Sequence, residues 1–337
     1  MAGTQAWSSL RAIDPTQVSL RWLPLLVLAE AGSALVSVLA QGMVLGVRSR
    51  WLGLWVLPPG RRPPPGPPDV VMSRGSAIDP AGDAPTLRTL LTTALAATAL
   101  GYLVPGGPAV SAAYAARRFR RMGVPYAEAA QSQVATAACA GVALAAVTLT
   151  GLVIPGAARE AGIAAGPLVL ARGATVLLLA VSLALLVVVR SDASRHGLGR
   201  SRLVRWVTGT RDPGTGDGQV APLLGVRRLA ACAALSVGVV LLDLAVLIGA
   251  LHATHVPVPW RSLLLAYGLA QLVSLLPLTP GGAGLVEFGL GALLVAKSAP
   301  DGAVALAVLL YRAVSWGAVV SAGAVALAVQ RRTPPPR

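Results

Sequence analysis

The chain has 337 residues, of which 55% are hydrophobic and only 12% are charged. Because a soluble domain carries about 25% charged residues, this composition excludes an ordinary soluble protein and indicates an all-α integral membrane protein. The formal net charge of +15 does not indicate a nucleic-acid partner, since the basic residues lie in loops between apolar runs, where they report orientation. Only two cysteines occur, both inside apolar runs, so we expect no disulfide framework, metal site or cofactor.

Five apolar runs reach the roughly 20 residues that a helix needs to span the hydrocarbon core. They predict membrane spans at residues 22–46, 127–154, 163–189, 229–252 and 302–329. A Pro-rich segment at 58–68 follows the first span and predicts an extended linker. The loop 190–228 contains eight arginines and three aspartates, so we place this basic loop and the linker on the cytoplasmic side.

The first of two broken segments, 88–116, lies between the first two spans. Its apolar run stops at Pro105-Gly106-Gly107, because proline removes a backbone donor and clashes with the preceding turn. Residues 109–116, between the break and the next basic cluster, would rise about 12 Å as a helix, too little to cross a core of about 30 Å. We therefore expect a re-entrant hairpin that returns to the cytoplasmic side.

The basic cluster after this hairpin consists of Arg117, Arg118, Arg120 and Arg121, with Tyr114 just before it. One interpretation is a positive-inside anchor, with the tyrosine at the depth of the membrane interface. The other is a rim that binds lipid phosphate, because arginine holds phosphate bidentately and basic cytoplasmic pockets bind anionic head groups. The sequence leaves both interpretations open.

The second broken segment, 261–297, is interrupted at Pro280-Gly281-Gly282. We expect a second re-entrant hairpin, although its later arm, 283–297, could instead complete a kinked crossing. Three full spans separate the two hairpins, so they would face opposite sides of the membrane. Two oppositely oriented broken elements are the pattern of an inverted repeat.

Ionisable residues inside the apolar segments are costly and usually face a cavity or a partner. Glu287 and Arg312 are spaced so that they can form an ion pair, which either lines a polar path or merely locks two helices together. We expect Glu30 and Asp243 to make structural hydrogen bonds rather than to contact a substrate. Arg172 is expected to extend its charged end toward the interface.

Two motifs resemble those of the lysylphosphatidylglycerol synthase transmembrane family, a flippase-like family, in its actinobacterial form. The first runs from Pro105 to Tyr114 and is followed by Arg117 to Gly123; the second is the Pro280-Gly-Gly-Ala-Gly-Leu-Val-Glu287 run with Arg312 downstream. The resemblance covers about residues 20–330 within a single transmembrane domain, 1–337. It carries over eight residues, namely Pro105, Gly106, Gly107, Pro280, Gly281, Gly282, Glu287 and Arg312.

In full-length aminoacyl-phospholipid synthases of this family, a C-terminal soluble domain is thought to transfer the amino acid. Here the sequence ends at Arg337, so we expect no aminoacyltransferase activity. The family usually has one more N-terminal span than we predict for this chain. The resemblance implies a plasma-membrane module that moves or handles an anionic phospholipid or a polyprenyl-linked glycolipid.

The leading hypothesis is therefore lipid translocation, with the two breaks meeting near the membrane midplane. Glu287 and Arg312 would line a polar path, and the arginine rim with Tyr114 would receive the head group. The alternative is a non-transporting scaffold that holds a glycosyltransferase or another envelope-biosynthesis enzyme at the membrane. A membrane-embedded enzyme is the least expected, because no nucleophile and base converge, and the absence of a Walker loop argues against direct use of ATP.

Overall fold

The computed structural model describes residues 18–45, 87–104, 107–122, 124, 126–190, 224–276, 279, 282–295 and 301–332. Every regular element within these ranges is a helix. The predicted linker, most of the basic loop 190–228, and four residues of the two breaks, namely Pro105, Gly106, Pro280 and Gly281, lie outside the described residues.

Five helices in the described part of the chain are long and apolar enough to cross a membrane, and they confirm the five predicted spans. They cover Leu20–Leu45, Glu128–Val153, Ala165–Arg190, Val226–Ala253 and Gly302–Gln330. The corresponding elements are η2 (Leu20–Trp22) with α2 (Leu23–Leu45), α5 (Tyr126–Val153), α7 (Ala165–Arg190), α10 (Val226–Ala253), and α13 (Asp301–Arg312) continuing through η5 (Ala313–Ala318) into α14 (Val319–Arg332). A short helix, α6 (Ala157–Glu160), connects α5 to α7.

Each broken segment forms two shorter helices that pack against each other. The first pair is α3 (Leu87–Leu103) with α4 (Gly107–Arg121), and the second is α11 (Leu263–Ser274) with α12 (Leu285–Val295). These helices have 11 to 17 residues, which gives lengths of about 16 to 26 Å, below the roughly 30 Å of the hydrocarbon core. The hairpins are thus present, while their entry and exit on one side of a membrane stay a prediction.

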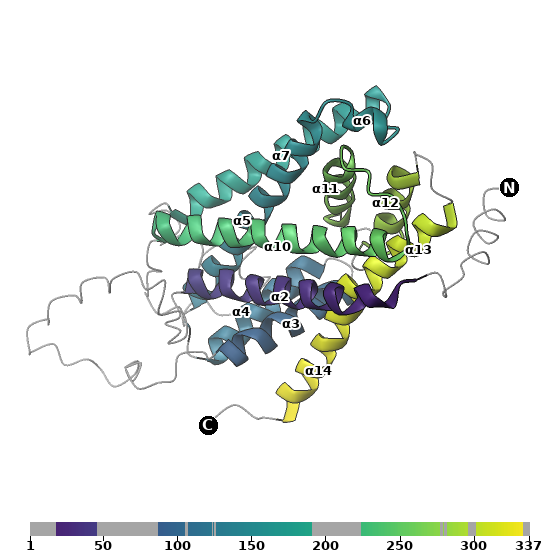
Figure 1. Ribbon diagram of the computed structural model, residues 1–337. Helices are drawn as coiled ribbons and strands as arrows, with labels where there is room; N and C mark the ends of the chain where they lie inside the picture. The colour runs from purple at the N-terminus through teal and green to yellow at the C-terminus, as the bar shows by residue number, and fades with distance from the viewer. Residues whose placement is uncertain are drawn as a thin grey trace, which may run out of the picture.

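The helices α2 and α10 lie side by side and run antiparallel at the centre of the fold (Figure 1). Their opposite directions follow from contacts between the start of one and the end of the other. The backbone N–H of Ser19 donates to Ala253 O at 2.8 Å, and the Trp22 ring stacks on His252 with 5.3 Å between ring centroids.

The packing around this central pair repeats from one half of the chain to the other. The helix α3 packs on α14 as α11 packs on α5, and α4 packs on α5 as α12 packs on α13. This repetition, together with the antiparallel α2 and α10, agrees with the predicted inverted repeat. The helix α7 stands outside the repeat and packs mainly on α5 (Figure 1). Many of its large apolar side chains are exposed.

Glycines allow the hairpins to approach their neighbours closely, as small residues do between helices in lipid. A Cβ on Gly151 of α5 would lie 2.5 Å from the backbone nitrogen of Leu265 in α11. In the other half, a Cβ on Gly323 of α14 would lie 2.5 Å from the carbonyl oxygen of Leu95 in α3. In each hairpin, the backbone of one helix therefore packs directly against a glycine of a long span: α11 against α5, and α3 against α14.

Candidate functional site

A cavity of about 400 Å³ lies where the two hairpins converge. Residues beside both breaks line it: Val104 and Gly107 at the first, and Leu275, Leu276 and Thr279 at the second. The remaining walls come from α2, α5, α10, α13 and η5. Described residues that flank the two breaks therefore line one cavity, while the meeting of the breaks near the membrane midplane stays a prediction.

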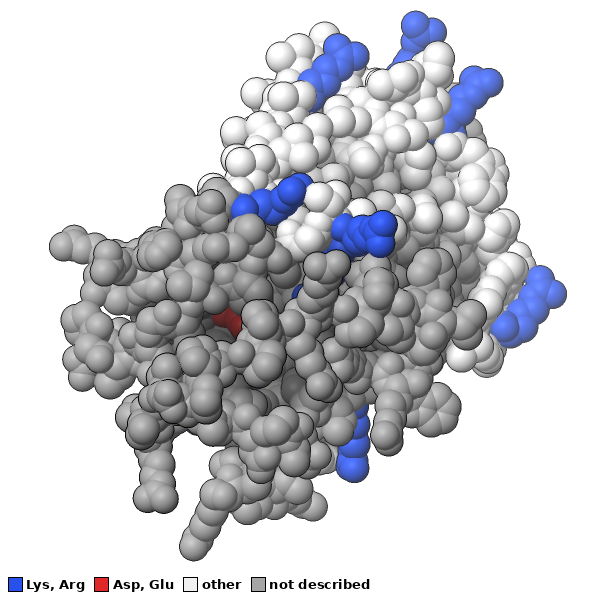
Figure 2. Space-filling model, turned by 90° about the vertical axis from the view of Figure 1, so that its left-hand side faces the viewer, with Lys and Arg blue, Asp and Glu red and all other residues white. Residues whose placement is uncertain are grey.

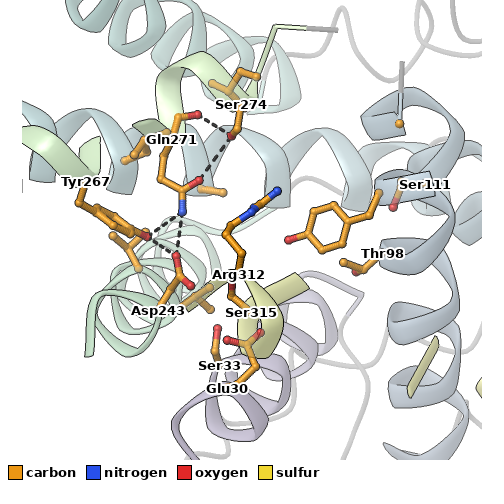
Figure 3. A pocket seen from close by; sticks show the side chains of 18 of the residues that line it. Glu30, Ser33, Thr98, Ser111, Asp243, Tyr267, Gln271, Ser274, Arg312 and Ser315 are labelled. Carbon is orange, nitrogen blue, oxygen red and sulfur yellow. Dashed lines mark hydrogen bonds between the residues drawn. The ribbon is translucent and has the colours of Figure 1, made fainter. Parts of the chain in front are cut away.

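The most polar wall of the cavity is built around the carboxylate of Asp243 on α10 (Figure 3). Its Oδ2 accepts hydrogen bonds from Tyr267 Oη at 2.7 Å, Gln271 Nε2 at 2.8 Å and Tyr311 Oη at 2.9 Å. The hydroxyl of Ser274 in turn donates to the backbone carbonyl oxygen of Gln271 at 2.7 Å. Three donors on one oxygen stabilise a charged carboxylate in the interior and fix α10, α11 and α13 relative to one another.

Arg312, at the end of α13, forms the ion pair that the sequence predicted. Its Nε donates to Glu287 Oε1 at 2.7 Å, and the two side chains are 14% and 25% exposed, respectively. The second oxygen, Glu287 Oε2, accepts the backbone N–H of Gly284 at 2.7 Å, where Gly284 has a φ of 83°. Glu287 thereby caps the first turn of α12 and holds the guanidinium of Arg312 in place.

The structure corrects one part of this prediction, because Glu287 does not belong to the cavity lining whereas Arg312 does. Because Glu287 lies in the first turn of α12, its carboxylate accepts a hydrogen bond from the backbone N–H of Gly284. It therefore stabilises the start of the helix that follows the second break. Glu287 is thus a positioning residue for Arg312.

Glu30 and Ser33 of α2 line the side of the cavity formed by the central helix pair (Figure 3). Because α2 and α10 are antiparallel and Gly32 faces Leu242 while Val36 faces Gly238, Glu30 lies at the level of Asp243. The Oε2 atom of Glu30 is buried and has no hydrogen-bond partner among the described residues. The predicted hydrogen bonding by Asp243 is confirmed. Glu30 and Asp243 also line the cavity, a position that the sequence did not predict for either of them.

The first hairpin contributes hydroxyl groups to the lining. Thr98 and Ser111 lie on this side of the cavity (Figure 3), and Tyr102 also lines it. Gly107 is buried, and a Cβ there would overlap the carbonyl oxygen of Gly101, so only glycine allows α3 and α4 to meet so closely. Of the first-break residues predicted as site residues, Gly107 is the one that the structure describes and places in the lining.

The predicted arginine rim lies away from this cavity. Arg117, Arg118, Arg120 and Arg121 are absent from its lining, and Tyr114 Oη donates to Gln330 Oε1 at 2.5 Å, beside the end of α14. Gly282, with a φ of 70°, lies in the second break but not in the lining either. Arg117, Arg120 and Arg121 of α4 are exposed. Figure 2 shows one face of the molecule, on which Lys and Arg side chains project from the described surface.

Sequence reasoning missed most of the hydrogen-bonding side chains in the cavity. Tyr267 and Gln271 are four residues apart and so share one face of α11, and Tyr311 precedes Arg312. Asp243 in an apolar run was the available signal that such donors exist. The widened π-helical turn η5, which brings Ser315 into the lining, had no sequence signal. The described residues contain no group of three His, Cys, Asp or Glu that could hold a metal ion.

These features define a multi-pass helical membrane protein in which two interrupted helical segments line one cavity that contains charged and hydroxyl groups. The sequence profile of the lysylphosphatidylglycerol synthase transmembrane region matches residues 3–323, and the chain belongs to this family. The plasma membrane is the usual location of the family. No curated protein matches the chain.

Proposed function

We propose that the protein translocates a membrane lipid across the plasma membrane by passing its polar head group through the cavity between the two hairpins. One observation carries the proposal: described residues that flank both helix breaks line the same cavity, and that cavity also contains charged and hydroxyl groups inside an otherwise apolar bundle. Broken helices that meet near the midplane of two inverted halves are where membrane transporters hold their substrates. Membership of a family named for lysylphosphatidylglycerol synthase supports a lipid as the substrate.

The proposed path lowers the main barrier to lipid exchange, which is the desolvation of the head group in hydrocarbon. Burying a polar group without a partner costs roughly 2–7 kcal/mol, and the cavity offers hydroxyl, amide, carboxylate and guanidinium groups as substitutes for water. We propose that the acyl chains remain in the bilayer beside the hairpins, whose helices are too short to cross it. The hairpins would thus be re-entrant, with irregular backbone only where it borders the cavity.

An anionic phospholipid or a polyprenyl-linked glycolipid is the substrate class that we propose. Arg312, held by Glu287, is a cation of the lining whose N–H groups can donate to a phosphate oxygen. The hydroxyl groups of the lining can donate hydrogen bonds to a glycerol or sugar or accept them from it. We assign no bond-making or bond-breaking step to the protein, and propose that it is not an enzyme.

The test is lipid exchange in liposomes that contain purified protein and fluorescent anionic or polyprenyl-phosphate lipids. Ser111→Leu combined with Ser274→Leu fills the cavity from both hairpins, so it should slow exchange at least tenfold. Ser321→Leu is the matched control, because Ser321 lies on the exposed face of α14. Exchange by the wild type and the control but not by the double variant supports the proposal; exchange by all three proteins contradicts the path.

The alternative scaffold function is favoured by one feature, the Lys and Arg side chains that project from the described surface in Figure 2. Exposed arginines at the start of α3 and α10 and the end of α4 and α7 include Arg88, Arg190, Arg227 and Arg228. Such a face can attract an acidic envelope enzyme as well as anionic lipid. If no labelled lipid moves in the assay and the protein is folded, translocation is excluded and the scaffold becomes the better account.

A further inference from the structure

Glu30 differs from the other charged groups of the cavity, because its interactions are incomplete. Asp243 has three hydrogen-bond donors, and Arg312 is paired with Glu287. Glu30 Oε2 is buried at the same level as Asp243, yet no described residue donates to it. An ionised carboxylate in the middle of a membrane protein is costly unless it gains a partner.

The groups that face Glu30 do not supply that partner. The helix α10 contributes Asp243, which has the same charge, and α3 contributes Tyr102. The helices α11 and α13 contribute Tyr267 and Tyr311, and both tyrosines donate to Asp243. The helix α13 also contributes Arg312, which is paired with Glu287 of α12. The wall formed by α5 consists of Ala140 and Leu144, which carry no charge. A small cation that joins Glu30 would therefore satisfy a group that the fold leaves open.

We propose that Glu30 binds and releases a proton during each cycle, so that lipid movement is coupled to the proton gradient across the membrane. This inference rests on the proposed function, and it supplies the energy source for movement against a gradient. An O–H bond forms at Glu30 when the cavity takes a proton from water on one side. The bond breaks when the cavity opens to the other side, and no electron is transferred.

A proton fits this position better than a metal cation because of how many ligands each needs. Metal ions need several oxygen ligands at once, while Tyr267, Gln271 and Tyr311 are already engaged with the Asp243 carboxylate. A proton needs one oxygen, and it removes the like-charge repulsion between Glu30 and Asp243. Ionisable residues inside membrane proteins commonly serve as such proton relays.

The proton site can be tested without any transport. Purified full-length protein in detergent is titrated, and infrared difference spectra record the carbonyl stretch of a protonated carboxylic acid. We expect a band that disappears in Glu30→Gln, shifts in Glu30→Asp, and persists in Glu128→Gln, which changes an acid outside the cavity lining. A titrating band that is the same in the wild type and in both Glu30 variants would overturn the assignment.

Coupling is tested in liposomes with a pH difference of one unit, the membrane voltage being held at zero by potassium and valinomycin. One pH unit corresponds to about 1.4 kcal/mol, so one proton per lipid would shift the leaflet ratio of labelled lipid up to about tenfold. Glu30→Gln should show no gradient-dependent shift. Equilibration by the wild type with a ratio that ignores the gradient overturns the coupling and leaves the proposed function intact. Failure of the wild type to move any lipid refutes the proposed function and with it the coupling, while the infrared titration still decides whether Glu30 binds a proton.

Discussion

The two hairpins occupy equivalent places in the repeated packing, but different interactions hold them. The first, α3–α4, depends on small residues: Gly107 meets the backbone at Gly101, and Gly323 meets it at Leu95. The second, α11–α12, has a similar glycine contact with α5 and in addition an ion pair and a hydrogen-bonded carboxylate. The second hairpin is therefore held by an ion pair and hydrogen bonds as well as by packing, whereas the first is held mainly by close packing at glycines.

The sequence explains this difference at one position. Seven residues after Pro280 comes Glu287, whereas seven residues after Pro105 comes Ala112. The first hairpin thus has no acid at the point where the second caps its helix and holds Arg312. We infer that the second half supplies most of the charged and hydrogen-bonded groups of the cavity, and that the first half supplies a closely packed wall.

Breaking the ion pair of the second hairpin should have the largest effect. Arg312→Ala leaves Glu287 without its cation. Removing one partner of a fully buried pair costs about 3–5 kcal/mol, and the cost is smaller here because the pair is only partly buried. We expect a lower unfolding temperature in detergent and at least a tenfold loss of lipid exchange. The double variant Glu287→Gln with Arg312→Gln should recover much of the stability but not the exchange, and equal unfolding temperatures for single and double variants would contradict the account.

The first hairpin should be most sensitive to added volume. In Gly107→Ala the new methyl group overlaps the carbonyl oxygen of Gly101, and overpacking of this kind costs about 1–3 kcal/mol. The matched control is Gly289→Ala in α12, where a Cβ would meet nothing within 4 Å. Thermal unfolding should separate the two variants, and a Gly107→Ala protein as stable as the control would show that the close approach is unimportant.

A smaller effect is expected from removing one donor to Asp243. Tyr311→Phe deletes a hydrogen bond to a charged group, worth about 1.5–3 kcal/mol, and should slow exchange several-fold because the cavity wall loosens. Tyr114→Phe removes the bond to Gln330 outside the cavity and serves as the comparison. Exchange rates measured in parallel should fall for Tyr311→Phe alone; an equal fall in both would point to general destabilisation.

The smallest effect on exchange should come from the arginines at the end of α4. Since Arg117 and Arg120 do not line the cavity, Arg117→Gln with Arg120→Gln should leave the exchange rate within about twofold. The same change should weaken attraction to anionic lipid by about 1 kcal/mol per charge at low salt. Flotation with anionic vesicles and exchange assays on one preparation test both parts, and a tenfold loss of exchange would restore the rim hypothesis.

The sequence predicts what depends on local properties of the chain. Span length, the two prolines and the short arms beside them predict the five long helices and the two hairpins. The partnership of Glu287 with Arg312 follows from their charges and spacing in apolar segments. These predictions succeed because hydrocarbon thickness and backbone hydrogen bonding constrain each segment separately.

What the sequence does not predict is the rotation of each helix about its axis. That rotation directs the Glu287 carboxylate to the backbone at the start of α12. It also turns Tyr267, Gln271 and Tyr311 toward Asp243. The arginines of α4, by contrast, do not line the cavity. It is decided by packing between segments far apart in the chain, including the glycine contacts. The unpartnered Oε2 of Glu30 likewise becomes apparent only when α2 is placed against α10.

The central claim is that the head group passes between the two hairpins, and reversible cross-linking tests it most directly. Ser111→Cys and Ser274→Cys place one thiol on each hairpin in the cavity lining, in a protein whose Cys139 and Cys232 are replaced by serine. A cleavable thiol-reactive linker joins the pair, and each single-cysteine protein treated alike is the control. The account predicts that cross-linked protein exchanges lipid no faster than protein-free liposomes and recovers when the linker is cleaved. Exchange at the uncross-linked rate, with the hairpins demonstrably joined, would contradict it.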